Sequence, residues 1–124
     1  MKNDVLIVDD DRSVIRTVKR ILTRAGLNVY VAESGEECLN HLEKGFQGLI
    51  LMDIIMPEMD GWDTIDEIVK RGLMKDIIIC MLTGKDEPGE RMESLKEYVI
   101  DYIRKPFNME TLVDVVKNYL SYLK

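Results

Sequence analysis

The chain has 124 residues, a length that favours one domain, residues 1–124, with a single sizeable core. Apolar residues make up 46% and charged residues 32% of the sequence, which is typical of a soluble globular protein. The net charge of -6, with no Lys and Arg cluster that stands out, argues against a nucleic-acid surface and favours protein partners or bound cations.

Strand-like and helix-like segments alternate along the chain. Short apolar runs predict strands over residues 5–8, 29–32, 49–53, 77–82 and 99–103. Apolar residues at helical spacing predict helices over residues 12–25, 35–45, 61–72 and 108–123. The segment 85–98 is charged, contains Pro88-Gly89 and has only Met92 and Leu95 as apolar anchors, so we expect a short and poorly anchored helix there.

Polar residues and glycines mark the ends of these helices. Asp11 and Asn108 are the expected N-caps of the first and last helices, and Ser34 with Glu37 has the spacing of a capping box. Helix stops are expected near Gly26, Gly45 and Gly72. Repeated strand-then-helix units predict an α/β fold in which helices cover both faces of a parallel sheet. Right-handed crossovers favour a three-layer, doubly wound arrangement.

Ligands of such sheets bind outside the carboxyl ends of the strands. Five polar side chains stand at these ends: Asp9, Asp10, Asp53, Thr83 and Lys105. Asp53 ends an apolar run and is followed by a loop that Pro57 and Gly61 enforce. Three converging carboxylates repel one another, so either one takes a proton or a cation lies among them. Ligands that are all oxygen favour Mg²⁺, with Mn²⁺ as the other choice.

A hydroxyl and an ammonium beside such a cation suit a phosphoryl group. An aspartate can attack phosphorus to give an acyl phosphate. Thr83 would then donate a hydrogen bond to one phosphoryl oxygen, and Lys105 would pair with another. Each residue alone is weak support, since Asp and Thr at strand ends often belong to turns, but five at matching strand ends are a strong signal.

The chain resembles the receiver domain of two-component response regulators from Val5 to Leu123. The resemblance rests on Val8-Asp9-Asp10, Met52-Asp53, Met56-Pro57, Asp60-Gly61, Leu82-Thr83-Gly84 and the run from Tyr102 to Phe107. It implies a flavodoxin-like, five-stranded parallel sheet with strand order 2-1-3-4-5.

The resemblance also implies a role for each matching position. Asp53 would be the phosphoacceptor, Thr83 and Tyr102 the switch pair, and Lys105 the phosphate-pairing ammonium. Mg²⁺ would be held by Asp9, Asp10, Asp53 and the backbone carbonyl of Ile55, and the peptide before Pro106 would be cis.

The implied function is a phosphorylation-dependent signalling switch. A histidine kinase or histidine phosphotransfer protein would phosphorylate the chain, and the surface of the fourth helix, fifth strand and fifth helix would change its affinity for an unknown downstream protein. The chain would not be an enzyme beyond self-directed phosphotransfer and autodephosphorylation. Gly84, where the family often has Ala, and Pro88-Gly89 depart from the family pattern and make the fourth helix atypical.

The remaining features are consistent with a cytoplasmic protein. Cys38 and Cys80 have no metal-ligand spacing and are expected to be buried free thiols. Neither a signal peptide nor a membrane-spanning run is seen. For the chain as a free-standing protein we expect output through protein contact, as a monomer or a phosphorylation-promoted dimer; as a piece of a longer regulator, its output domain would lie outside this sequence. His41 is expected to be a partly exposed helix residue, not a phosphodonor.

Two other functions are compatible with the same residues. The pattern Asp9-x-Asp11 after an apolar strand also resembles haloacid-dehalogenase-type phosphatases, in which Asp9 would be the nucleophile. The chain lacks a later acidic pair and room for a cap domain, which disfavours this alternative. The other function is a receiver-like interaction module that is not phosphorylated, against which the intact set of site residues argues.

Overall fold

The computed structural model describes residues 3–84 and 94–123, which form one five-stranded parallel sheet in the order β2-β1-β3-β4-β5. The strands are β1 (Asp4–Val8), β2 (Asn28–Ala32), β3 (Gly48–Asp53), β4 (Ile77–Thr83) and β5 (Asp101–Arg104). The helices are α1 (Arg12–Arg24), α2 (Gly35–Glu43), α3 (Gly61–Lys70) and α5 (Met109–Leu120), with a 3-10 helix, η1 (Lys96–Tyr98). The predicted α/β class and strand order are confirmed.

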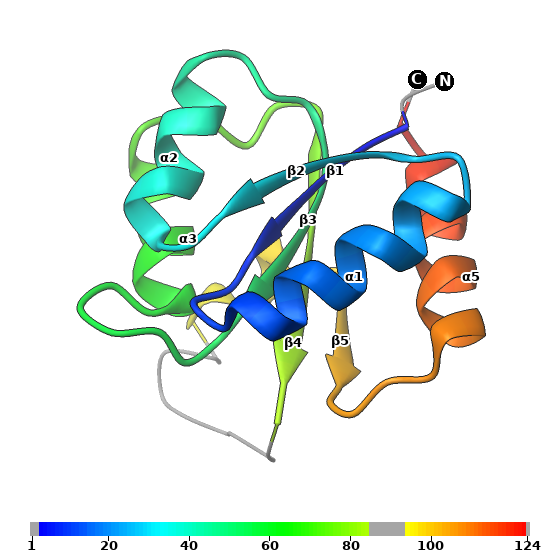
Figure 1. Ribbon diagram of the computed structural model, residues 1–124. Coiled ribbons are helices and arrows are strands. Elements are labelled where there is room, and N and C mark those ends of the chain that lie inside the picture. The colour runs from blue at the N-terminus through cyan, green and yellow to red at the C-terminus, as the bar shows by residue number, and fades with distance from the viewer. Residues whose placement is uncertain (1–2, 85–93, 124) are drawn as a thin grey trace.

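The sheet is the middle of three layers. Helices α1 and α5 cover one face and α2 and α3 cover the other (Figure 1). An apolar core lies on each face of the sheet, and the side chains of successive β1 residues point into one core and then the other. A strand in this position must therefore be apolar on both sides. Central strand β3 is buried at every residue. This burial fixes the position of Asp53, the last residue of β3, at the carboxyl edge of the sheet.

The helix caps at both ends of the chain are as predicted. Asp11 accepts hydrogen bonds from the Ser13 hydroxyl and from the backbone N–H groups of Ser13 and Val14, and these bonds lower the pKa of Asp11. Asn108 accepts from the N–H groups of Glu110 and Thr111.

The capping box predicted at Ser34 is only half formed. Ser34 accepts from Glu37 N–H, but the Glu37 carboxylate accepts from Glu33 N–H, not from Ser34. A complete capping box joins Asp60 and Asp63 at the start of α3, which was not predicted.

The fifth strand begins later than predicted. Val99 N–H bonds to the Lys96 carbonyl and closes the turn of η1, so regular pairing starts at Asp101. Most of the predicted fourth helix, including Pro88-Gly89 and Met92, lies outside the described residues. On α5 the predicted Leu112 and Val116 are fully buried, as is Leu120, which was not predicted, while Val115, Tyr119 and Leu123 are partly buried.

Basic side chains gather on α1, contrary to the expectation that no such cluster exists. All five are exposed, and Arg12–Arg24 contains no acidic residue: Arg12, Arg16, Lys19, Arg20 and Arg24. The argument against a nucleic-acid surface therefore rests on the net charge alone. Within the described residues, every helix is too short or too polar to cross a membrane.

Candidate functional site

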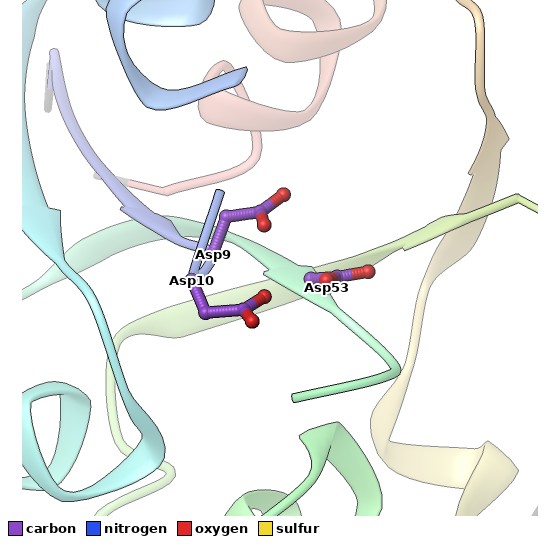
Figure 2. Close-up of side chains that lie close together, drawn as sticks. All are labelled: Asp9, Asp10 and Asp53. Carbon is purple, nitrogen blue, oxygen red and sulfur yellow. The ribbon is translucent and has the colours of Figure 1, made fainter. Parts of the chain in front are cut away.

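Three carboxylates converge at the carboxyl ends of β1 and β3. These strands pair in register, with Val8 opposite Met52, so Asp9 and Asp10 follow β1 beside Asp53. One ligand oxygen from each of the three lies within 4.8 Å of the others. Figure 2 shows the carboxylates of Asp9 and Asp10 extending toward the side on which Asp53 lies. Asp9 is fully buried, Asp53 is 8% exposed and Asp10 is exposed.

Lys105 supplies a positive charge to this cluster. Its Nζ lies 2.9 Å from Asp9 Oδ2 and 3.4 Å from Asp53 Oδ1. The other oxygen of Asp9 accepts a hydrogen bond from Asp11 N–H at 3.0 Å. The backbone N–H of Lys105 donates to the Thr83 carbonyl, and the peptide between Lys105 and Pro106 is cis, as the resemblance implied. The ends of β4 and β5 thus hold the ammonium over the aspartates.

The charges of the site shift one another's pKa values. Burial, followed by the charge of Asp9, raises the pKa of Asp53 to about 6, although Lys105 opposes this rise. Burial disfavours the ammonium of Lys105, but the hydrogen bond to Asp9 and the charge of Asp53 outweigh it and raise its pKa. Lys105 therefore stays charged at neutral pH, while burial and the charge of Asp9 disfavour the ionised form of Asp53.

Thr83 and Tyr102 lie on the neighbouring strands β4 and β5. Thr83 ends β4, opposite Arg104, and is partly buried. Tyr102 stands opposite Met81, and its ring centroid is 6.4 Å from that of Trp62 on α3. The hydroxyl oxygen of Tyr102 is buried, so the ring is turned toward the protein interior.

The loop after β3 is shaped by a close backbone approach. A Cβ at Gly61 would lie 2.5 Å from the Asp53 carbonyl oxygen, and Gly61 N–H donates to the Ile54 carbonyl at 2.8 Å. Only glycine fits there without a shift of the backbone, so Gly61 sets α3 against the end of β3. Ile55, in the same loop, exposes 66% of its surface. The sequence identified Gly61 as a loop residue but not this contact.

His41 and the two cysteines lie away from the site. His41 is partly exposed, as predicted; its Nε2 is 3.0 Å from the Val31 carbonyl oxygen, and its ring packs edge-on against Tyr30. It lines a cavity of about 660 Å³ near the amino ends of β1 and β2, at the opposite end of the strands from Asp53. Cys38 and Cys80 are buried free thiols, which confirms that prediction.

The doubly wound sheet, with an acidic trio and a lysine at its carboxyl edge, defines a receiver-type signalling module. A family model described as the response regulator receiver domain matches residues 5–117, and the chain belongs to this family. The predicted resemblance is therefore confirmed, and it places the chain among the proteins of two-component signal transduction.

Solved structures and curated sequences agree with this assignment. A CheY-like receiver domain protein from Methanospirillum hungatei JF-1 is 48% identical with a TM-score of 0.92, over 96% of this chain and 94% of that chain. The chemotaxis protein CheY4 of Vibrio cholerae is 30% identical with a TM-score of 0.84, over 95% and 98%.

The probable transcriptional regulator ycf27 of Porphyra purpurea is 34% identical over 119 residues, which are 96% of this chain and 48% of that protein. The chain thus spans about half the length of the curated relatives it matches.

Proposed function

We propose that this chain is a phosphorylation-dependent switch in which Asp53 accepts a phosphoryl group from a histidine kinase or a histidine phosphotransfer protein. The observation that carries the proposal is the place of Asp53 at the end of β3, beside the aspartates that follow β1 and 3.4 Å from the ammonium of Lys105. Membership of the receiver family supports the donor class.

The geometry favours Asp53 over Asp9 as the nucleophile. Both oxygens of Asp9 are engaged, one by Lys105 and one by Asp11 N–H, and its side chain is fully buried. Asp53 retains some exposure, at 8%, through which a phosphoryl donor can approach. This difference argues against the phosphatase alternative, which requires Asp9 to attack.

The same carboxylates fit Mg²⁺. Asp9, Asp10 and Asp53 offer oxygen atoms close enough to share one small, hard cation, and we assign the Ile55 carbonyl as a further ligand. When bound, Mg²⁺ would neutralise negative charge on the carboxylates and on the phosphoryl oxygens. It would also favour the ionised form of Asp53, which is the form that can attack phosphorus.

In the proposed reaction an Asp53 oxygen forms a bond to phosphorus while the bond from phosphorus to the donor histidine nitrogen breaks, which leaves an acyl phosphate. Lys105 pairs with one phosphoryl oxygen, and the Thr83 hydroxyl donates to another. The Tyr102 ring and the surface around β5 and α5 then shift their populations and change the affinity for a downstream protein, with or without dimerisation. Attack by water on the acyl phosphate resets the switch.

Trp62 provides a direct test because it is the one tryptophan of the chain, is buried and packs near Tyr102. We expect its fluorescence to change saturably with Mg²⁺ and again when beryllofluoride, an acyl-phosphate mimic, is added. Asp53→Asn should abolish the second change, while Asp114→Asn, at an exposed position of α5, should keep it. An unchanged beryllofluoride response in Asp53→Asn would refute the assignment, and no response to either ligand in the parent would favour the interaction module.

A further inference from the structure

The carboxylate of Asp101 joins β5 to α5 through hydrogen bonds. Asp101, the first residue of β5, accepts the backbone N–H of Tyr102 on Oδ1 at 2.8 Å. Its Oδ2 accepts the Tyr119 hydroxyl at 2.7 Å, and Tyr119 lies in the last turn of α5. The residue next to the proposed switch tyrosine is therefore tied directly to the end of the last helix.

Tyr119 keeps its phenol proton at physiological pH and donates it in a hydrogen bond to a carboxylate. This bond joins a neutral donor to a carboxylate, which shortens and strengthens a hydrogen bond. Because the phenol donates to the Asp101 carboxylate, the pKa of Tyr119 is raised to about 12, so Tyr119 remains a donor. The ring of Tyr119 also packs edge-on against that of Tyr122, with centroids 5.9 Å apart.

The other contacts that hold α5 to the sheet are less specific. The buried side chains of α5, Leu112, Val116 and Leu120, pack in the apolar core that contains Leu82 and Ile103. Apolar packing has little directionality, whereas a hydrogen bond fixes both distance and angle. The hydrogen bond between Asp101 and Tyr119 therefore adds a directional contact at the last turn of α5 that apolar packing does not supply.

We propose that Asp101 and Tyr119 are positioning residues that couple Tyr102 to the last turn of α5, so that a change at Asp53 reaches the carboxyl end of the domain. This inference rests on the proposed function and adds to it a route by which a change at Asp53 reaches the last turn of α5. The apolar core already joins β5 to α5, and the shared carboxylate adds a directional link between Tyr102 and Tyr119.

The test compares two tyrosine variants that each lose one hydroxyl. Tyr119→Phe removes the donor to Asp101 and keeps the ring, while Tyr122→Phe removes a hydroxyl from a side chain that is 60% exposed. Backbone amide NMR shifts are recorded with Mg²⁺, before and after beryllofluoride. In Tyr119→Phe we expect the beryllofluoride-induced changes in amide chemical shift near Asp53 to persist. The corresponding changes at residues 119–123 should be at least about twofold smaller than in the parent and in Tyr122→Phe.

Equal responses at residues 119–123 in Tyr119→Phe and the parent would overturn the coupling. Asp101→Asn, which retains one acceptor oxygen, should also weaken the distal response and provides a second variant if Tyr119→Phe unfolds. A purely structural role would lower the melting temperature without separating the two regions. Absence of any beryllofluoride-induced shift near Asp53 in the parent would instead overturn the proposed function, and the coupling with it.

Discussion

Replacing Asp53 by Asn should stabilise the metal-free protein at neutral pH. Burial and the charge of Asp9 raise the pKa of Asp53 to about 6, from 3.8 for an unperturbed aspartate. Each pKa unit corresponds to about 1.4 kcal/mol, so the ionised carboxylate destabilises the folded state by up to about 3 kcal/mol. Asparagine has a similar shape and no charge. We therefore expect Asp53→Asn to raise the free energy of unfolding by about 1 to 3 kcal/mol.

The effect has a defined pH dependence. The folded state binds the Asp53 proton more tightly than the unfolded chain does, because its pKa is higher in the folded protein. The stability of the parent should therefore fall as the pH rises from about 4 to about 6, and this contribution should level off above that range. Below about pH 4 the carboxyl is protonated in both states, so the advantage of asparagine should disappear.

Urea denaturation followed by circular dichroism measures both effects. The parent, Asp53→Asn and the surface control Asp114→Asn are compared with a chelator present, at about pH 7.5 and about pH 4. The reasoning predicts a gain for Asp53→Asn at the higher pH only and no gain for Asp114→Asn. Equal stability of Asp53→Asn and the parent at about pH 7.5 would refute the claim that burial and the charge of Asp9 disfavour ionised Asp53 in the folded site.

Two further predictions concern packing around the site and in the core. Gly61→Ala should lower the free energy of unfolding by about 1 to 3 kcal/mol, because the new methyl group meets the Asp53 carbonyl oxygen; an unchanged urea midpoint would contradict this. Cys38 and Cys80 should react slowly with a disulfide reagent in the native protein and rapidly in urea, because burial raises the pKa of both thiols to about 12. Rapid labelling of both thiols under native conditions would contradict the burial.

The sequence predicted those parts of the site that depend on strand ends. Parallel strands end at the same edge of a sheet, and Asp9, Asp10 and Asp53 each follow or end an apolar run. The fold class therefore predicted that these three carboxylates lie close together. The different burial of Asp9 and Asp10 was not predicted. Adjacent side chains of an extended chain point to opposite sides, and this alternation would have predicted that only one of Asp9 and Asp10 is buried.

Other features depend on contacts that short sequence windows do not contain. The pairing of Lys105 with Asp9 joins residues 96 positions apart, and the contact of Tyr119 with Asp101 depends on how α5 lies on the sheet. The late start of β5 comes from the turn that Val99 N–H closes. By contrast, the basic surface of α1 follows from the spacing of Arg and Lys along one helix, a local pattern that the sequence contains.

Intact-mass spectrometry after incubation with acetyl phosphate and Mg²⁺ tests the central claim most directly. The account predicts one phosphoryl adduct on the parent, a weaker adduct on Asp9→Asn, none on Asp53→Asn and none when Mg²⁺ is chelated. Asp53→Asn should remain folded because we expect this substitution to stabilise the metal-free protein, so the loss of its adduct would report on the chemistry. An adduct that depends on Asp9 and forms on Asp53→Asn would contradict the account.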